Sequence, residues 1–206
     1  GRKTMAIISD MDQPLGAAIG NALEVKEAIE TLQGNGPEDL TELCLTLGSQ
    51  MVVVAGHAAT LEEAREQLKE VIANGKALDV FKQFVEAQGG NPAVADDPSL
   101  LPQAKYKVEV PAKQAGFIGH IVADEIGTAA MLLGAGRATK ESEIDLAVGL
   151  MLHKKVGDAV EEGDSLVTIY ANREDVQEVI EKIYANISIV DTKPAIPALI
   201  EEVITE

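Results

Sequence analysis

The chain has 206 residues, of which 46% are hydrophobic and 25% are charged, a composition typical of globular proteins rather than of disordered ones. Its 34 acidic and 17 basic residues give a formal net charge of −17, which disfavours nucleic-acid binding because phosphates would be repelled. No apolar run approaches the roughly 20 residues that a membrane-spanning helix needs, and the first residues do not form a signal peptide. We therefore expect a soluble protein that binds neither nucleic acid nor membranes.

Few side chains suggest catalysis on their own. The single cysteine, Cys44, cannot form a disulfide within the chain, which predicts a reducing compartment and hence a cytoplasmic location. It lies on the apolar face of an expected helix and has no activating neighbour, so we expect a buried, unreactive thiol. His57, His120 and His153 are far apart, and none has a second ligand at metal-binding spacing. By residue chemistry alone, the chain contains no complete active site.

Residues 1–103 predict an incomplete α/β layer. The run "TMAIISDMD" is continuously apolar and ends in acids, as in a buried parallel strand. Four helical patterns follow, among them "PEDLTELCLTLGSQMVVVA", expected to be largely buried, and "TLEEAREQLKEVIANG", which begins with a capping box of Thr60 and Glu63. One strand with four helices is only part of an α/β layer, so we expect a fragment of something longer.

Residues 104–190 predict a second, α+β domain, which follows the proline-rich boundary "NPAVADDPSLLPQAK". We expect short strands in "KYKVEV", "GFIGHIV", "VGLMLHK" and "SLVTIYA", and helices in "DEIGTAAMLLGAG" and "REDVQEVIEKIYAN", the latter with Asn172 as N-cap. The "GAG" that follows the first helix is expected to end it and not to bind phosphate, because carbonyl groups point outward there. The tail, residues 191–206, carries two prolines and a short amphipathic end that either docks or frays.

The stretch "DMDQPLGAAIGNALEVKEAIE", residues 10–30, is a candidate cation site. Loop carbonyls beside a carboxylate on the next helix would provide an all-oxygen site for a hard cation. Glu24 and Glu27 are three residues apart, so they share a helix face and one of them could turn back toward the loop. The alternative, favoured by composition alone, is that both are solvated helix acids.

The whole sequence resembles the C-terminal half of a bacterial pyrimidine-nucleoside phosphorylase, a family close to thymidine phosphorylase. The resemblance implies a homodimeric enzyme that converts uridine, deoxyuridine or thymidine and phosphate reversibly into free base and pentose 1-phosphate. It also implies substrates bound between a small helical domain and a larger α/β domain. The segments that carry it include "GRKTMAIISDMDQPLGAAIGNALEVKEAI", "DLTELCLTLGSQM", "NGKALDVFKQFVEAQGG", "GTAAMLLGAGRATKESEIDLAVGLMLHKKVGDAV" and "GDSLVTIYAN".

The resemblance also implies which residues act. The family's phosphate loop and its base-holding residues belong to the N-terminal half, so it implies no catalytic or substrate-binding residue here. The family's monovalent-cation site, usually for potassium, uses both halves, and its positions in this sequence fall on the carbonyls of Leu15 and Ala18 and the carboxylate of Glu27. A large cation held by only three protein oxygens would keep most of its water. We therefore expect ion binding and activity only when the N-terminal half is present as a partner.

Two other interpretations remain open. The stretch "HKKVGDAVEEGDSLVTI" is similar to half of the motif of biotinyl and lipoyl domains. No hairpin lysine stands at the expected place before it, so the similarity suggests a barrel-like, hammerhead-like architecture of the C-terminal α+β domain rather than carrier chemistry. A purely structural interaction domain, which would respond to no ligand, is the other alternative.

Overall fold

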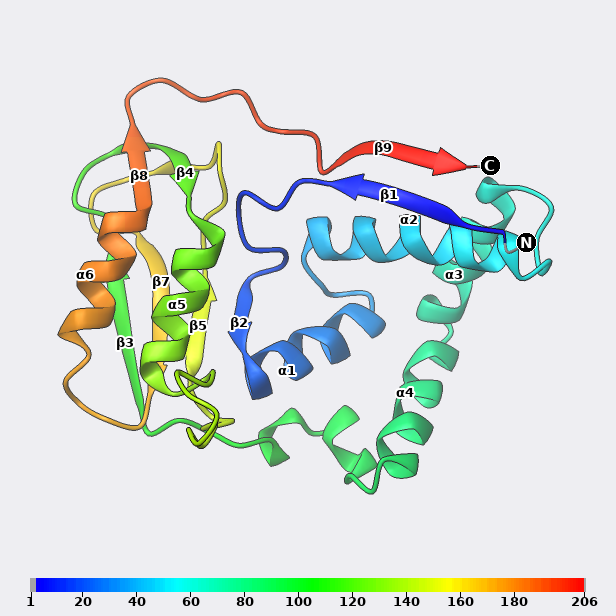
Figure 1. Cartoon of the computed structure of the whole chain (residues 1–206), viewed down its shortest axis with the longest axis horizontal. Helices are drawn as coiled ribbons and strands as arrows, with labels where there is room; N and C mark the ends of the chain where they lie inside the picture. Colours follow the sequence, from blue (N-terminus) through cyan, green and yellow to red (C-terminus); the bar gives the residue numbers. More distant parts are fainter. Residues whose placement is uncertain (1–2, 206) are drawn as a thin grey trace. The chain divides into compact units, whose positions relative to one another are not determined.

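The computed structural model describes residues 3–205, and their contacts divide the chain into two compact units (Figure 1). The first unit takes in the start of the chain, residues 27–100, and the end from residue 198 onward. The second unit comprises residues 11–26 and 101–197. The main boundary therefore lies near residue 100. The segment 11–26, expected in the first domain, groups with the second, and the end of the tail groups with the first.

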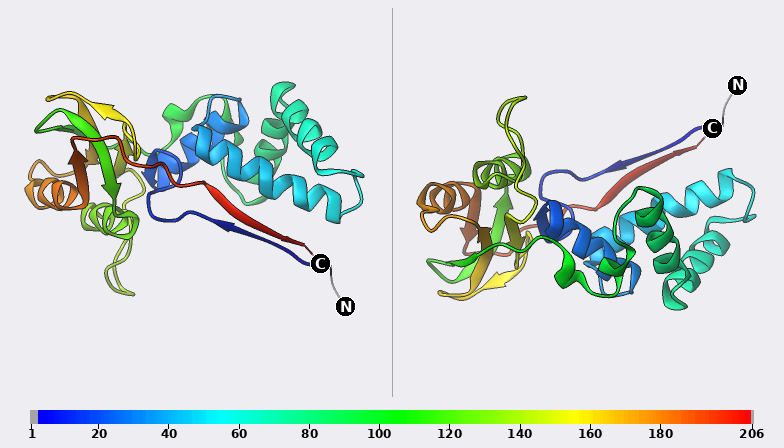
Figure 2. Two further views of the ribbon diagram at one scale, coloured as in Figure 1. Left: turned by 90° about the horizontal axis from the view of Figure 1, so that it is seen from above. Right: turned by 90° about the horizontal axis from the view of Figure 1, so that it is seen from below.

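The first unit contains a two-stranded antiparallel sheet. Strand β1 (Met5–Ser9) pairs with β9 (Ile200–Thr205), and Ile7 lies opposite Val203. The two strands run side by side in all three views of Figures 1 and 2. The tail thus docks. The expectation of a buried parallel strand is wrong, since β1 is antiparallel and its side chains alternate between half-buried and exposed.

Helices make up the rest of the first unit. Helix α1 begins in the second unit and continues into the first, and α2 packs against α3. At Gly48 in α2 the approach is close, because an added Cβ would lie 2.8 Å from Cδ1 of Leu68. The helices are α1 (Asn21–Leu32), α2 (Glu38–Val54), α3 (Leu61–Ala73), α4 (Lys76–Ala87) and the short 3-10 helices η1 (Pro92–Ala95) and η2 (Pro98–Leu100).

Two expectations about α2 are wrong. The helix is mostly not buried: among its residues only Leu45, Ser49 and Gln50 are. Cys44 is exposed, although partial desolvation raises the pKa of its thiol. The apolar pattern of α2 identified a helix correctly, but several of its apolar side chains, among them Leu47 and Met51, are exposed.

The capping box of α3 is confirmed. The side chain of Thr60 accepts a hydrogen bond from the backbone N–H of Glu63 at 3.2 Å, and the Glu63 carboxylate accepts one from the N–H of Ala59 at 2.9 Å. Two amides at the helix start are thereby satisfied, and the cap fixes where α3 begins.

Replacing Thr60 with alanine should lower the free energy of unfolding by about 1 kcal/mol, since the N–H of Glu63 loses its acceptor. Chemical denaturation followed by circular dichroism measures this change. Thr128→Ala is the matched control, because the Thr128 hydroxyl only donates to the carbonyl of Asp124 within the exposed face of a helix. Equal losses in the two variants would contradict the capping role.

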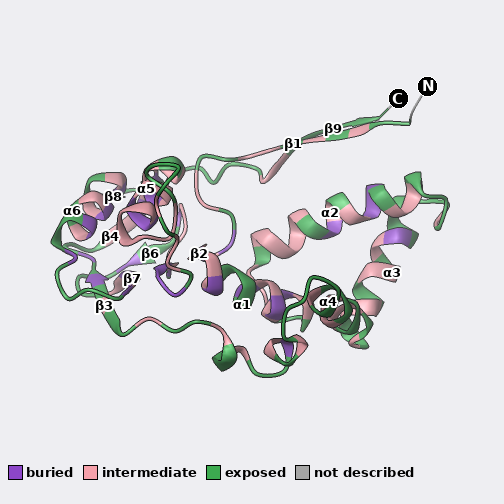
Figure 3. Cartoon of the chain, turned by 60° about the horizontal axis from the view of Figure 1, so that its bottom comes forward, coloured by how far each residue is buried: buried purple, intermediate pink, exposed green. Residues whose placement is uncertain are grey.

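The second unit holds two antiparallel sheets, two complete helices and the beginning of α1. The first sheet has the order β2-β5-β7-β3 and the second β6-β4-β8. Figure 3 shows buried positions gathered on these strands, which surround a shared core that includes Ile118, Ile126 and Ile169. The elements are β2 (Ala18–Gly20), β3 (Tyr106–Pro111), β4 (Gly116–Ile121), α5 (Ala123–Leu133), β5 (Gly149–Leu152), β6 (Ala159–Val160), β7 (Ser165–Ala171), α6 (Gln177–Asn186) and β8 (Ile187–Val190).

The predicted class, an incomplete α/β layer followed by an α+β domain, is confirmed. The sheet of the first unit contains two strands, β1 and β9, where one was expected. Helix α5 ends as expected at Gly134, whose φ of 107° is left-handed. Asn172 is not the N-cap of α6, which begins only at Gln177. Its amide instead donates to Asp145 at 2.6 Å. No helix among the described residues is long and apolar enough to cross a membrane.

Candidate cation-binding segment

The segment with the predicted carbonyl ligands is built into the sheet of the second unit. Ala18, which is 4% exposed, lies opposite Met151 in the β2–β5 pair, and the N–H of Leu152 donates to the carbonyl of Ala17 at 2.8 Å. The strands approach so closely that a Cβ on Gly149 would lie 2.3 Å from the carbonyl oxygen of Ile19. Backbone pairing with β5 therefore sets the direction of the chain at Ala18.

The turn before β2 is fixed by partners distant in sequence. The Gln13 side chain accepts a hydrogen bond from the N–H of Val156 at 3.0 Å, and Lys155 donates through Nζ to the carbonyl of Pro14. Gly16 has φ of 68°, a left-handed conformation that favours glycine, and Leu15 beside it is 39% exposed. Sequence analysis missed the contributions of Gln13 and Lys155. More than 140 residues separate the partners, so no local pattern could have revealed them.

The two acids of α1 differ in environment. Glu24 is exposed and turns back toward the loop, where its carboxylate accepts a hydrogen bond from the N–H of Gly20 at 2.9 Å. Glu27 is only 7% exposed, so the interpretation of both as solvated acids is wrong for Glu27. Burying a carboxylate is costly unless a cation or hydrogen bonds compensate for it. Of the two acids, only Glu27 is buried as an ion ligand would be.

The predicted ligands lie on both sides of the division between the units. Leu15 and Ala18 belong to the second unit, and Glu27 is the first residue of the part of α1 in the first unit. Carbonyl and carboxylate oxygens are the donors that hard cations prefer, so the residues fit such an ion chemically. No group of three or more His, Cys, Asp or Glu that could hold a metal occurs within residues 3–205.

A second polar group lies on the β3–β7 pair, in the same cross-strand row as Ala18. The hydroxyl of Thr168 donates to the carboxylate of Glu109 at 2.9 Å and lies 2.7 Å from Nε2 of His153. A hydroxyl has one proton, and here the carboxylate accepts it, so the His153 ring must be the donor to Thr168. The histidine is thus not placed to activate a nucleophile. His153, like His57 and His120, is exposed.

The Glu109 carboxylate should make stability depend on pH. Hydrogen bonds from Ser165 and Thr168, together with the nearby His153 and Lys107, hold its pKa below the usual value of 4.5. The charged form is therefore stabilised in the folded state. This contribution is present above about pH 4.5 and is lost as the pH falls through the lowered pKa.

Glu109→Gln should therefore destabilise the protein at pH 7 more than at pH 3. Urea denaturation at the two pH values measures the difference. Thr168→Val, which removes only one of the donors, should show a smaller difference of the same sign. If Glu109→Gln lowers the free energy of unfolding equally at pH 7 and at pH 3, the proposed role of this carboxylate is wrong.

The two lysines in the stretch that is similar to biotinyl and lipoyl domains, Lys154 and Lys155, both donate hydrogen bonds. Lys154 Nζ donates to the Asp164 carboxylate at 3.1 Å and to the carbonyl of Ala159 at 3.0 Å. Lys155 Nζ donates to the carbonyl of Pro14. A lysine that carries biotin or lipoate needs a free ammonium group at a turn. The structure gives the carrier interpretation no support.

The domains of the chain match two known families. Residues 1–78 match the a/b domain of a glycosyl transferase family, and residues 117–190 match the pyrimidine nucleoside phosphorylase C-terminal domain. Together with the mixed α/β fold, these matches indicate part of a glycosyl transferase a/b domain followed by a C-terminal domain of the pyrimidine nucleoside phosphorylase type.

Curated relatives match the chain along its whole length. It is 68% identical to the pyrimidine-nucleoside phosphorylase of Bacillus subtilis over 206 residues, 64% identical to that of Geobacillus stearothermophilus and 61% identical to that of Staphylococcus haemolyticus. Each alignment covers 100% of this chain and 47% of the relative, so the chain spans about half the length of the curated relatives that it matches. The resemblance to the C-terminal half of a bacterial pyrimidine-nucleoside phosphorylase is confirmed.

Proposed function

We propose that the chain acts as part of a pyrimidine-nucleoside phosphorylase that transfers the pentose of uridine, deoxyuridine or thymidine to phosphate. The observation that carries this proposal is the 68% identity to the Bacillus subtilis enzyme, which extends over the whole chain. An identity of this size across both units supports a shared reaction. The observation covers only half of the relative, so the activity belongs to an assembly that includes the rest.

In the proposed reaction, a phosphate oxygen attacks the anomeric carbon of the nucleoside while the bond from that carbon to the base nitrogen breaks. The base leaves with the electron pair of that bond and takes up a proton. Such a reaction is accelerated by holding the two reactants in line and by stabilising the leaving base, and it needs little acid–base chemistry. This chain would contribute scaffold and cation ligands. The phosphate-binding and base-binding residues would come from the complementary polypeptide.

We propose further that Leu15 and Ala18, through their carbonyls, and Glu27, through its carboxylate, contribute to a potassium site. Three observations support this: the hard oxygen chemistry of the three positions, the fixed turn around Gly16, and the burial of Glu27. The complementary polypeptide would supply further oxygens. The family resemblance also supports a homodimer, and the single cysteine supports the cytoplasm.

The test combines the purified chain with a separately produced polypeptide that covers the part of the Bacillus subtilis relative that the chain does not match. With uridine and phosphate, neither polypeptide alone should release uracil, and the mixture should. Uracil release by this chain alone would contradict its proposed inactivity. A mixture that forms a complex but releases no uracil would contradict the proposed function.

A further inference from the structure

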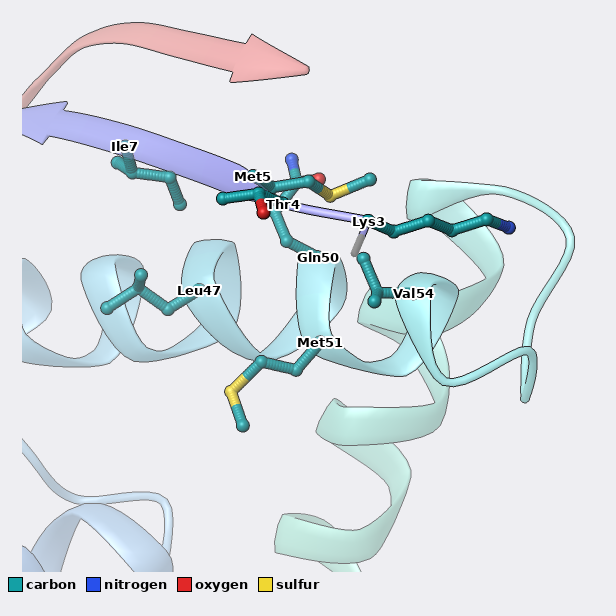
Figure 4. Close-up of a pocket in the computed structure, with 8 residues that line it drawn as sticks. All are labelled: Lys3, Thr4, Met5, Ile7, Leu47, Gln50, Met51 and Val54. Carbon is teal, nitrogen blue, oxygen red and sulfur yellow. The ribbon is translucent and has the colours of Figure 1, made fainter. Parts of the chain in front are cut away.

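The segment with the candidate carbonyl ligands lies in the better packed of the two units. In the first unit a cavity of about 300 Å³ remains open between β1 and α2, with Leu47 and Met51 on its helical side (Figure 4). Among the described residues, every large side chain that is fully buried belongs to the second unit, except Ile29. Leu15 and Ala18 are part of the second unit, so contacts within this chain hold them in place.

The loop before β2 and the loop after β5 continue the pairing of the two strands. Ala18 lies opposite Met151 in the β2–β5 pair. The same antiparallel register extends through three hydrogen bonds beyond this pair, which join Ala17 to Leu152 at 2.8 Å, Pro14 to Lys155, and Gln13 to Val156 at 3.0 Å. Leu15 and Gly16 lie between these contacts, and the φ of 68° at Gly16 turns the chain there. The turn that carries the Leu15 carbonyl is therefore held on both sides.

The proline at position 14 explains why a lysine side chain makes one of these contacts. Proline has no N–H group, so Pro14 cannot form both hydrogen bonds of an antiparallel pair, but its carbonyl still needs a donor. Nζ of Lys155 provides that donor. The planar peptide group of Pro14 ends at the Cα atom of Leu15, so only the dihedral angles of Leu15 separate the held carbonyl from the candidate ligand.

The turn that presents Lys155 is itself fixed. Its N–H donates to the carboxylate of Asp158 at 2.7 Å, and the N–H of Asp158 donates back to the Lys155 carbonyl at 3.0 Å. The N–H of Gly157 donates to the carbonyl of Ile118 in β4 at 2.8 Å. A donor on a fixed turn loses little conformational freedom when it binds its acceptor, so Lys155 is suited to hold the Pro14 carbonyl in one position.

We infer that Lys155 is a positioning residue for the proposed potassium site. Through its hydrogen bond to Pro14, it keeps the carbonyl of Leu15 in the orientation in which that carbonyl binds the ion. A ligand that is already oriented need not be ordered when the ion binds, which raises the affinity. The positive charge of Lys155 would by itself repel potassium, so the lysine acts through position and against its own charge. The inference rests on the proposed function, in which Leu15 supplies a ligand.

The test measures potassium binding without substrate by the assembled pair, which consists of this chain and the complementary Bacillus subtilis polypeptide. A bound ion raises the midpoint of thermal unfolding, so potassium chloride replaces tetramethylammonium chloride stepwise at constant ionic strength. Lys155→Met keeps an unbranched side chain but removes the donor, and the dissociation constant for potassium should rise roughly tenfold. Lys155→Arg still donates and should stay within roughly threefold of the unchanged pair. A merely structural role would lower the midpoint in both salts and leave the difference between them unchanged.

Lys154→Met is the matched control. It removes the same charge one position earlier and breaks hydrogen bonds of Nζ to the Asp164 carboxylate at 3.1 Å and to the carbonyl of Ala159 at 3.0 Å. Neither of these partners belongs to the loop before β2. The potassium dissociation constant of this variant should stay within roughly twofold of the unchanged pair.

Gln13→Leu is a second, independent way to loosen the turn. It removes the acceptor of the Val156 N–H and leaves Lys155 in place. Potassium binding should weaken in the same direction as in Lys155→Met. This variant tests the inference even if Lys155→Met does not fold.

Three results would overturn the inference: potassium affinity that is unchanged in Lys155→Met and Gln13→Leu, tighter binding in Lys155→Met, or equal weakening by Lys154→Met. Tighter binding would show that the charge of Lys155 outweighs its positioning effect. If the unchanged pair releases uracil but binds no potassium, the proposed potassium site is wrong and the inference falls with it. If the pair binds potassium with the expected differences but performs no phosphorolysis, the proposed function is wrong and the positioning role of Lys155 stands.

Discussion

Replacement of Gly149 by alanine should lower the free energy of unfolding by about 3 kcal/mol or more, through overpacking against backbone atoms that cannot move aside. The added Cβ would lie 2.3 Å from the carbonyl oxygen of Ile19 and 3.1 Å from Cα of Gly20. Both atoms belong to β2, so the strand that carries Ala18 would be pushed away from β5. Urea denaturation measures the loss, and hydrogen exchange should be faster at Leu152, whose N–H donates to the carbonyl of Ala17.

Gly163→Ala is the control for Gly149→Ala. Gly163 has a left-handed φ of 93°, and an added Cβ there would meet nothing within 4 Å. Its replacement should therefore lower the free energy of unfolding by only about 1 kcal/mol, the cost of a left-handed backbone conformation for a residue that has a Cβ atom. Equal losses in the two variants would contradict the close contact between β2 and β5.

Glu27→Gln should weaken the binding of potassium to the assembled enzyme. The amide keeps the shape of the side chain but carries no negative charge, and an oxygen site for a cation depends strongly on that charge. We expect the potassium concentration for half-maximal uracil release to rise at least roughly tenfold. Activity titrated with potassium chloride against a constant ionic strength measures the change.

Glu24→Gln is the matched control on the same helix. Glu24 is exposed and accepts a hydrogen bond from the N–H of Gly20, and the oxygen of a glutamine amide can accept the same bond. The potassium requirement should therefore stay unchanged in this variant. If both variants shift the requirement equally, or neither does, the proposed role of Glu27 is wrong.

Local sequence patterns predicted most of the elements. The capping box at Thr60 and the glycine stop at Gly134 each depend on contacts within a few residues, and both are confirmed. Asn172 shows where local reasoning fails. It is a good N-cap by residue type, but its amide bonds to Asp145 and α6 begins five residues later. A partner that is distant in sequence decided the outcome.

The long-range pairings within each unit could not be predicted from the sequence. The pairing of β1 with β9 joins the two ends of the chain, and the contacts of Gln13 and Pro14 reach residues more than 140 positions away. The apolar run of β1 was compatible with either strand direction. The exposure of Cys44 also could not be foreseen, because an apolar helix face indicates that something covers it but not which segment does.

The candidate ion ligands came from the family resemblance rather than from residue patterns. A backbone carbonyl can bind a cation whatever the side chain of its residue, so the residue types at Leu15 and Ala18 do not indicate a cation site. The role of Glu27 was ambiguous for another reason. Its spacing from Glu24 places both acids on one helix face, and the sequence alone does not distinguish between them. In the structure Glu24 is exposed and caps Gly20, whereas Glu27 is buried.

The most direct test of the central claim is product analysis for the reconstituted pair of polypeptides. With uridine and inorganic phosphate, the pair should release uracil and ribose 1-phosphate in equal amounts, and the release should stop when phosphate is omitted. Equal amounts of uracil and free ribose, or uracil release that is independent of phosphate, would indicate hydrolysis and would contradict the assignment of this chain to a phosphorylase.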